Sequence, residues 1–369
     1  MPRARRAVRG AAGAGASARA AGLARRCGRR RAGRVVGCAR VIDVPVVLAG
    51  AGPVGRAYLD LVAARSRRWR ARYGVNVRVS AVRGRRGQAV PEGGSLPHGS
   101  WSPLTDLAAV LREHRARVFV QAVPSSAEAL PRAAAELHTA LEQGVHVATA
   151  TKTPLLTAWH DLDRAATDAG CAVRISGATG AALPAGDLAR SVLRGFDVEA
   201  VEGCPNGTAT FVLDRLADGI ELPEAIAAAQ RLGIAEADPT ADLSGDDAAT
   251  KLRLLAGLLW AADVPSMRVS ASPITEATAE EARSAAARGR RLRHVAVADS
   301  PESVRVDLRA EAATSPLGGL EGPDKAVTFH CGDAGAITVR GGRSSPHGAA
   351  LALAKDTLAT ALDPAVGLR

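Results

Sequence analysis

Three glycines at a fixed spacing are the first residues of this chain that could do chemistry. They lie in Gly50-Ala51-Gly52-Pro53-Val54-Gly55, a GxGxxG pattern that follows a short apolar run and precedes an amphipathic stretch. Between a strand and a helix, this spacing permits a tight turn and lets the backbone approach a pyrophosphate at the helix N-terminus. The pattern predicts that Gly50, Gly52, Pro53, Val54 and Gly55 bind a dinucleotide. A purely structural turn is the plain alternative in a chain with 38 glycines.

The second expected strand ends in basic residues. Proteins specific for NAD usually place Asp or Glu there, but neither type occurs between Asp60 and Glu92, where the chain has Arg83-Gly84-Arg85-Arg86. Guanidinium groups suit a 2′-phosphate through paired, charge-assisted hydrogen bonds. Arg83 and Arg85 therefore predict NADP, with NAD as the alternative if these are only solvated loop charges. Ser125, after the third expected strand, either binds the nicotinamide ribose or caps the next helix.

A second reactive group is the segment from Gly233 to Lys251, which holds five carboxylates and one lysine in nineteen residues. Asp247 and Lys251 are four residues apart on an expected helix, so their side chains share one face. A surface ion pair is the bland alternative and would contribute only about 0–1 kcal/mol. Because the helix continues with a heavily apolar run, we expect these charges to line a cleft. Lys152 follows the fourth expected strand, at the sheet edge where open α/β proteins bind ligands.

Short apolar runs that alternate with amphipathic stretches must position these residues. This alternation predicts a doubly wound parallel sheet (Rossmann fold), with strands at 45–49, 75–82, 118–123, 145–148 and 172–175 and helices at 54–72, 126–143 and 156–169. After a turn-rich crossing at 176–185, a second α+β domain with a mostly antiparallel sheet is expected. Its helices are predicted at 208–218, 223–232 and 246–262, and its strands at 268–272, 294–299, 304–309, 326–330 and 337–339.

The predicted domain boundaries follow from these elements. A tail occupies residues 1–40, the dinucleotide-binding domain residues 43–178, and the second domain residues 179–342. The last segment, 343–369, is expected to be a helix that packs back on the nucleotide domain. No internal repeat is visible.

The positive charge of the chain is confined to its first residues. Residues 1–40 hold twelve arginines and no acid, so subtracting +12 from the whole-chain +11 leaves about −1 for residues 41–369. The Ala, Gly and Arg composition predicts a disordered tail. Three interpretations remain: an arm attracted to nucleic acid or membrane, a transit peptide, or a translation start assigned too far upstream.

Composition also limits the class of protein. No stretch approaches the roughly 20 apolar residues of a membrane span, and the scattered cysteines of the body indicate neither a zinc site nor a disulfide framework. We expect a cytoplasmic protein without metal, membrane or nucleic-acid partner.

In their order along the chain, the motifs resemble the homoserine dehydrogenase family. The resemblance extends from about Val44 to Leu362, nearly the whole chain outside the tail. Its long and specific part is the acidic signature, and the other elements are individually weaker. The matching residues are Asp238-Pro239, Asp242, Gly245-x-Asp247, Lys251, the turn Asn206-Gly207-Thr208, and Lys152 in an Ala-x-Lys context.

The resemblance implies a function and roles for these residues. The family interconverts L-aspartate 4-semialdehyde and L-homoserine with NADP, on the route to threonine and methionine. Glu236, Asp242 and Asp247 would hold the amino and hydroxyl ends of the substrate, while Lys152, beside the cofactor, and Lys251 would handle the proton. Lys251 is the expected donor, because an ammonium can both stabilise and protonate the forming alkoxide. Asn206, Gly207 and Thr208 would contact the cofactor, and the second domain would form a homodimer through its sheet.

The chain also departs from the family pattern at two places. Ile234 stands where members often carry an aromatic residue, and Ser176-Gly177-Ala178-Thr179-Gly180 stands where the crossing segment usually begins with Glu. Family members build a monovalent cation site from backbone carbonyls nearby, so a bound cation remains an open alternative for this chain.

Two other functions compete with this interpretation. A homologous dehydrogenase acting on a different amino-acid-like semialdehyde or alcohol would use the same carboxylates and lysines. A binding protein without catalysis, with the arginine-rich tail as a nucleic-acid arm, has no need of two lysines at the site, and its binding should fall steeply with salt.

Overall fold

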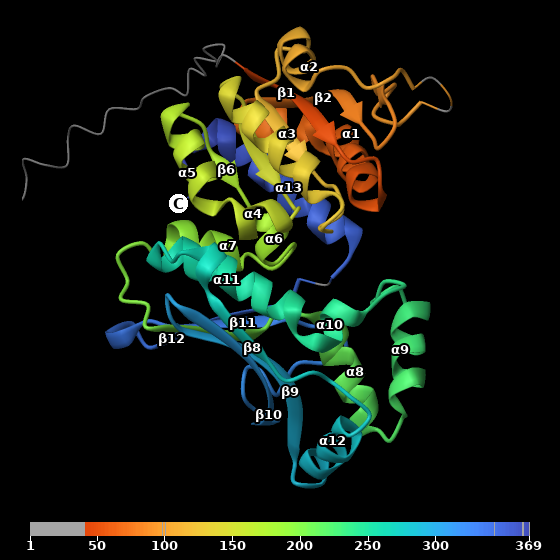
Figure 1. Ribbon diagram of the computed structural model, residues 1–369, viewed down its shortest axis with the longest axis vertical. Helices are drawn as coiled ribbons and strands as arrows, with labels where there is room; N and C mark the ends of the chain where they lie inside the picture. The colour runs from red at the N-terminus through yellow and green to blue at the C-terminus, as the bar shows by residue number, and fades with distance from the viewer. Residues whose placement is uncertain (1–40, 98, 100, 343, 364, 369) are drawn as a thin grey trace, which may run out of the picture. The chain divides into compact units, whose positions relative to one another are not determined.

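Two six-stranded sheets organise the chain, of which the computed structural model describes residues 41–97, 99, 101–342, 344–363 and 365–368. The expected tail, residues 1–40, lies outside the described residues. The predicted fold class, one mostly parallel and one mostly antiparallel sheet with helices, is confirmed (Figure 1). None of the described helices is long and apolar enough to cross a membrane.

The first sheet has the strand order β3-β2-β1-β4-β5-β6, and all its strands are parallel except β3. Its centre is β1, whose valine-rich run is buried from Val44 onward because helices cover both faces. The strands are β1 Ile42–Ala49, β2 Val75–Arg83, β3 Gln88–Ala89, β4 Val118–Gln121, β5 His146–Thr149 and β6 Val173–Arg174. The helices between them are α1 Pro53–Tyr73, α2 Leu107–Glu113, α3 Leu130–Glu142, α4 Thr153–Thr157 and α5 Trp159–Asp168.

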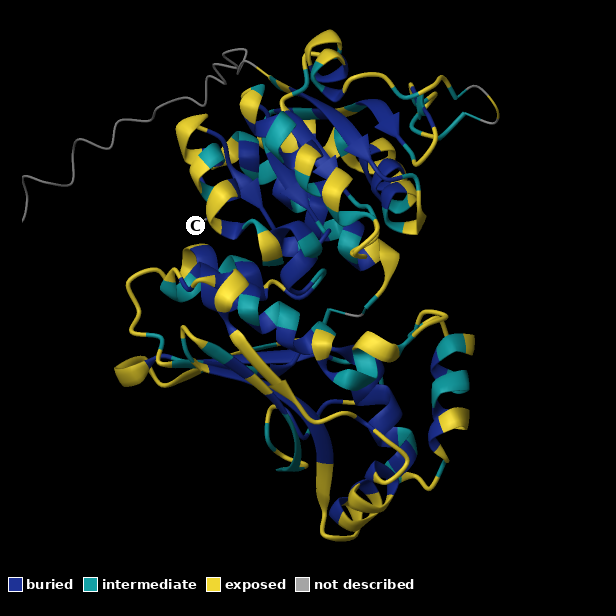
Figure 2. Ribbon diagram, in the orientation of Figure 1, coloured by how far each residue is buried: buried dark blue, intermediate teal, exposed yellow. Residues whose placement is uncertain are grey.

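The second sheet has the order β12-β11-β7-β9-β10-β8 and is antiparallel except for the pair β8 and β10. Helices α8, α11 and α12 pack on β9, and β8 is exposed along its whole length (Figure 2). The strands are β7 Ala200–Cys204, β8 Arg268–Ala271, β9 Arg290–Ser300, β10 Ser303–Ala312, β11 Ala326–His330 and β12 Ala336–Arg340. The helices are α8 Gly207–Ala217, α9 Leu222–Arg231, α10 Thr240–Ser244, α11 Asp246–Trp260 and α12 Thr278–Ala287, with short 3-10 turns η2 Val264–Ser266 and η3 Gly332–Ala334.

The crossing and the closing helix connect the two sheets. The crossing contains α6 Ser176–Thr179, α7 Ala185–Asp187 and the π-helix η1 Leu188–Val192. The closing helix α13, Pro346–Leu362, packs against α1, and the Tyr58 hydroxyl lies 2.8 Å from Thr357 Oγ1. Ala350 and Leu353 of α13 are fully buried in the same core cluster as β1. The predicted domain boundaries remain predictions.

Several elements differ from the sequence prediction. The helix expected at 156–169 is two helices, because the chain leaves helical geometry at Ala158. The helix expected from 126 begins only at Leu130, with Pro131 in its first turn, where proline is tolerated. Strands β3 and β7 and helices α2 and α12 were not predicted.

Candidate active site

The glycine loop joins β1 to α1 at the point where the strand order of the first sheet reverses. A Cβ on Gly50 would lie 2.2 Å from Ala122 O, and one on Gly55 would lie 1.9 Å from Gly50 O, so neither position accepts a side chain. Around Gly52, by contrast, a Cβ would meet nothing within 4 Å. The loop therefore leaves open space above the N-terminus of α1, and these residues fit a dinucleotide pyrophosphate.

The basic loop after β2 lies next to the glycine loop, since Gly50 N donates to Arg83 O at 2.8 Å. Arg83 itself is only 5% exposed, and its Nη1 donates to Gln88 Oε1 at 2.9 Å and to Thr105 O at 3.0 Å. Its guanidinium is thus fixed in the protein interior. Arg85 is exposed on the loop.

Arg132 of α3, which the sequence analysis did not single out, supports this loop. Its Nη1 and Nη2 donate to the carbonyls of Arg85 and Gly84, each at 3.3 Å, and its Nε donates to Glu136 Oε1 at 2.9 Å. The loop is thereby tied to the first sheet's helix layer while the side chain of Arg85 stays exposed.

Lys152 follows β5 and occupies the N-cap position of α4. Its backbone N donates to Ser125 Oγ at 2.8 Å, and its Nζ donates to Asp247 Oδ1 at 2.8 Å. Ser125 is exposed in the loop that follows β4, and its hydroxyl holds the Lys152 backbone by accepting this hydrogen bond. The sequence placed both residues at the carboxyl edge of the sheet, where they lie in contact.

Asp247, in the first turn of α11, is the centre of the site. Its Oδ2 accepts from Lys251 Nζ at 2.5 Å and from Asn206 Nδ2 at 2.7 Å, in addition to the bond from Lys152. Lys251 Nζ also donates to Pro205 O at 2.9 Å. The side chains of Asp247 and Lys251 are 11% and 12% exposed, and that of Lys152 is 29% exposed. One carboxylate thus bridges two ammonium groups: that of Lys152, at the start of α4 beside the first sheet, and that of Lys251, in α11 beside the second sheet.

Asn206 links Asp242 to this cluster. Its Nδ2 also donates to Asp242 Oδ1 at 2.5 Å, while its Oδ1 caps α8 by accepting from Ala209 N at 2.9 Å. Thr208 Oγ1 donates to Ile234 O at 3.2 Å, which holds the start of the acidic segment against α8. The Asn-Gly-Thr turn therefore orients the carboxylates, and its predicted contact with the cofactor stays a prediction.

Opposite charges in the cluster shift one another's pKa values so that the charged forms are favoured. Burial alone would raise the pKa of Asp247, but the ammonium groups of Lys251 and Lys152 outweigh it and hold this pKa well below its usual range. The Asp247 carboxylate raises the pKa of Lys152 above its ordinary value, against the opposing effect of burial. For Asp242, burial raises the pKa of the carboxyl above its ordinary value, although the Asn206 hydrogen bond opposes this.

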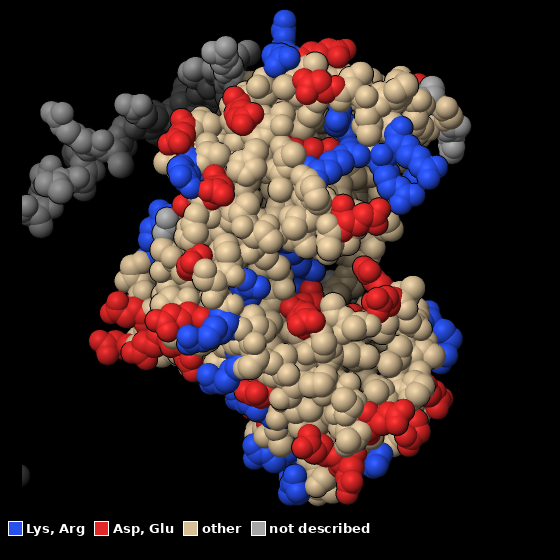
Figure 3. Space-filling model, in the orientation of Figure 1, with Lys and Arg blue, Asp and Glu red and all other residues tan. Residues whose placement is uncertain are grey.

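A hollow in the molecular surface separates the part around the first sheet from the part around the second, and both basic and acidic side chains gather near its inner end (Figure 3). Glu236, just before α10, is exposed, and its charge contributes to the raised pKa of Lys152. The predicted substrate carboxylates, Glu236, Asp242 and Asp247, therefore all act on the same cluster.

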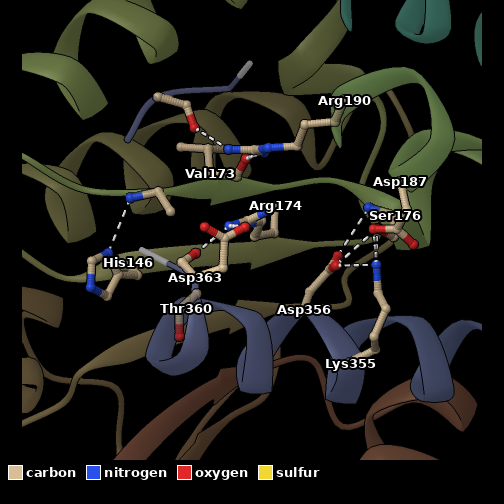
Figure 4. A network of polar contacts seen from close by, with 12 residues as sticks. His146, Val173, Arg174, Ser176, Asp187, Arg190, Lys355, Asp356, Thr360 and Asp363 are labelled. Atoms are coloured by element: carbon tan, nitrogen blue, oxygen red, sulfur yellow. Dashed lines mark hydrogen bonds and ion pairs between the residues drawn. The ribbon is translucent and has the colours of Figure 1, made fainter. Parts of the chain in front are cut away.

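Ser176, at the start of the crossing, belongs to a second polar network (Figure 4). Its backbone N donates to Asp356 Oδ2 at 2.9 Å and its Oγ to Asp356 Oδ1 at 2.8 Å, while Lys355 Nζ donates to Ser176 Oγ at 2.6 Å. Lys355 also pairs with Asp187 of α7. Where the family resemblance leads us to expect Glu, a serine hydroxyl therefore ties the crossing to α13.

A third lysine lies close to the cluster and was not found by sequence reasoning. Lys325 precedes β11, is 1% exposed, and donates through Nζ to Gly180 O of the crossing at 3.0 Å. Burial lowers the pKa of Lys325 to about 7, and Lys251, Asp247 and Lys152 act on it electrostatically. The Lys325 side chain therefore ties the segment before β11 to the crossing at the Gly180 carbonyl.

The arrangement brings three kinds of group together. The glycine loop at the edge of the first sheet can bind a dinucleotide, the lysine ammonium groups can stabilise and protonate an oxyanion, and the carboxylates can bind the ammonium group of an amino acid. Such a set of groups suits reduction of a carbonyl, or the reverse oxidation, on a small amino-acid-like molecule.

Comparisons with known proteins agree with this chemistry. Residues 184–358 match the family model described as homoserine dehydrogenase. A NAD(+)-dependent homoserine dehydrogenase of Pseudomonas canavaninivorans is 29% identical over 338 residues, which cover 86% of this chain and 96% of that protein. A homoserine dehydrogenase of Sulfurisphaera tokodaii is 30% identical over 219 residues, which cover 59% of this chain and 68% of that protein.

Solved structures give the same answer for the fold. A homoserine dehydrogenase from Thiobacillus denitrificans superposes with a TM-score of 0.75 at 26% identity, covering 87% of this chain and 75% of that one. A hyperthermophilic archaeal homoserine dehydrogenase in complex with NADPH gives a TM-score of 0.73 at 22% identity, covering 89% of this chain and 100% of that one. At 22% identity, the similarity to this NADPH complex supports a shared fold and nothing about the cofactor of this chain.

Proposed function

Because the chain belongs to the homoserine dehydrogenase family of NAD(P)-dependent oxidoreductases, we propose that it interconverts L-aspartate 4-semialdehyde and L-homoserine, with NADP as the preferred cofactor. The observation that carries this proposal is the bridge of Asp247 between Lys152 and Lys251, at 2.8 and 2.5 Å. A binding protein without catalysis would gain nothing from burying two ammonium groups at one carboxylate.

The cofactor would lie along the carboxyl edge of the first sheet. Gly50, Gly52, Pro53, Val54 and Gly55 would hold the pyrophosphate at the N-terminus of α1. When bound, the nicotinamide supplies the hydride that reduces the aldehyde carbon. Ser125 would fix the position of Lys152 through its backbone N, which keeps the lysine side chain directed toward Asp247.

The substrate would be held by the acidic segment. We assign the ammonium end of the amino acid to Glu236 and Asp242, because Glu236 is exposed and the Asp242 carboxyl belongs to the cluster through Asn206. Asp247 already accepts hydrogen bonds from Lys152, Lys251 and Asn206, so its main role would be to position the two lysines.

Lys251 would donate the proton to the forming alkoxide in reduction and accept it in oxidation. It is held by Asp247 and by Pro205 O, which leaves one of its three N–H donors for a reacting oxygen. Lys152, with its pKa raised by Asp247, would stay charged and stabilise the oxyanion.

Preference for NADP is supported by the exposed Arg85 and Arg86 on a loop that Arg132 anchors. The buried Arg83 serves this loop through Gln88 and Thr105, so we assign the 2′-phosphate to its exposed neighbours. The NAD(+)-dependent relative keeps NAD as the competing cofactor. We also propose a homodimer through the second sheet, whose strand β8 is exposed, and a cytoplasmic location.

The test is a cofactor-linked assay in both directions: NADPH or NADH oxidation with aspartate 4-semialdehyde, and NADP or NAD reduction with homoserine. We expect turnover with NADP favoured, and its loss in Lys251→Ala while NADPH binding, measured by fluorescence, is retained. Wild-type protein that binds NADPH but turns over neither substrate would exclude homoserine and leave another amino-acid-like semialdehyde, to be sought with a substrate panel.

A further inference from the structure

The two arginines at the tip of the β2–β3 hairpin are flanked by glycines. Gly84 N donates to Gly87 O at 2.8 Å, which closes the tip, and Arg85 and Arg86 between them are exposed. Glycine has more backbone freedom than any other residue, so a tip held only by its own backbone would be mobile. A mobile tip binds phosphate poorly, because binding must first order it. Whatever holds the tip in place therefore determines how well its guanidinium groups can meet a ligand.

The indole of Trp101 packs on both glycines. A Cβ on Gly84 would lie 3.2 Å from Cζ3 of this ring. A Cβ on Gly87 would lie 3.6 Å from Trp101 Cε3, 3.2 Å from Trp101 Cβ and 2.8 Å from Ser102 O. Several of these distances are shorter than ordinary van der Waals contact. The absence of side chains at positions 84 and 87 is therefore what lets Trp101 lie against the tip.

Trp101 is in turn attached to the first sheet. Its neighbour Ser102 exchanges two backbone hydrogen bonds with Gln88 of β3, at 2.8 and 2.9 Å. The partly buried Trp101 side chain packs against the core cluster that includes residues of β1 and α1. Arg132 separately holds the tip through two backbone carbonyls. The tip therefore has two supports, a polar one from α3 and an apolar one from Trp101.

We propose that Trp101 is a positioning residue for cofactor choice, which holds Arg85 and Arg86 where their guanidinium groups meet the 2′-phosphate that distinguishes NADP from NAD. This inference rests on the proposed preference for NADP and names the residue that turns a basic hairpin tip into a phosphate site. If Trp101 only filled the core, its removal would weaken both cofactors alike, because they share the adenosine and the pyrophosphate.

The experiment measures binding of NADPH and of NADH by fluorescence titration, because these cofactors differ only in the 2′-phosphate and the measurement requires no amino-acid substrate. The variants are Trp101→Ala, Trp101→Phe and the matched control Trp69→Phe. Trp69 belongs to the same core cluster but lies near the end of α1 that leads into β2, at the strand end opposite the tip. We expect Trp101→Ala to raise Kd for NADPH about tenfold and to leave Kd for NADH within about twofold. Trp101→Phe should retain most of the affinity for NADPH, and the control should behave as wild type.

Gly84→Ala tests the same contact from the other partner. The backbone of Gly84 is not left-handed, so alanine is permitted there, but its Cβ would press on the indole at 3.2 Å. We expect a smaller rise in Kd for NADPH alone. Adding Gly84→Ala to Trp101→Ala should cause no further rise, because both changes act on one contact. If Trp101→Ala does not fold, Gly84→Ala decides.

Equal weakening of both cofactors in the deciding variant, or unchanged binding of both, would overturn the proposal. A wild type that binds NADH as tightly as NADPH would overturn it as well. These outcomes are separate from the fate of the proposed reaction. A protein with the selective loss that turns over neither homoserine nor aspartate 4-semialdehyde keeps the inference and loses the reaction, whereas turnover without the selective loss keeps the reaction and loses the inference.

Discussion

Replacing Asp247 with asparagine would remove the negative charge that lies between two ammonium groups while preserving the size of the side chain. In the wild type, the carboxylate accepts from Lys152 at 2.8 Å, Lys251 at 2.5 Å and Asn206 at 2.7 Å. An amide retains one oxygen acceptor and turns an NH₂ group toward one of these donors. At least one lysine would therefore lose its partner.

The magnitude follows from burial. Breaking a buried ion pair costs about 3–5 kcal/mol, and we take about 3 kcal/mol because water can reach Lys152, which is 29% exposed. If the lysines must keep their positions for catalysis, this corresponds to about a hundredfold fall in kcat/KM.

The lysines depress the pKa of Asp247 in the folded protein. The ion pairs of this carboxylate therefore stabilise the fold fully above the pKa of an unfolded aspartate, about 4, and this stabilisation is lost only as pH falls through the lower pKa of the folded state.

The assay is homoserine oxidation by Asp247→Asn, measured together with thermal unfolding between about pH 5 and pH 8, where the carboxylate stays charged. Asp246→Asn is the matched control, since this neighbouring carboxylate is exposed and bonds to Ser244 Oγ at 2.8 Å. An Asp247→Asn protein with the kcat/KM and the unfolding midpoint of the control would refute the reasoning, and so would a loss that disappears at neutral pH.

Four further outcomes are expected. Gly52→Ala should fold with an unchanged unfolding midpoint, because its Cβ meets nothing within 4 Å, yet bind NADPH more weakly in a fluorescence titration. The Arg85→Ala/Arg86→Ala double variant should raise KM for NADP about tenfold to a hundredfold and leave KM for NAD nearly unchanged in steady-state assays. In the wild type, KM for homoserine should rise as pH falls through the raised pKa of Asp242, and Asp242→Asn should remove that dependence from the pH profile. Lys325 should titrate near pH 7 when its side-chain signal, one of four in lysine-labelled protein, is followed by NMR. Because the unfolded chain keeps this proton to higher pH, the free energy of unfolding should rise with pH above about 7 in the wild type, and this rise should be absent from Lys325→Met.

Part of the site could be predicted because it depends on local geometry. Asp247 and Lys251 share a helix face at a spacing of four residues, and Lys152 follows a parallel strand, so each was expected at a cleft. The contact between Lys152 and Asp247 spans 95 residues of sequence and depends on how α11 packs against the first sheet. Periodicity carries no information about such a distance.

Other features gave weak signals or misleading ones. Strand β7 is central in the second sheet, yet its five residues include Glu202 and Gly203, which break the apolar run. Helix α12 buries Ala279, Ala282 and Ala285, whose small side chains hardly mark an apolar face. Arg83 was expected in a phosphate site, but as the last residue of β2 it points into the interior toward Gln88. For Lys325, the scarcity of lysine was the one available signal.

The path of α13 bears on how the polypeptide can mature on the ribosome. The core around β1 includes Ala350 and Leu353, and Ala172, just before β6, forms a bridge with Gly367. Residues translated after the second sheet therefore complete a layer that begins about 300 positions earlier in the sequence. N-terminal domains usually fold as soon as they emerge, but here the nascent nucleotide half must wait, with one side of α1 uncovered, until the second sheet has been synthesised. Chaperones would meet it in that interval, and a chain interrupted after β12 should be degraded rather than accumulate as a free cofactor-binding fragment.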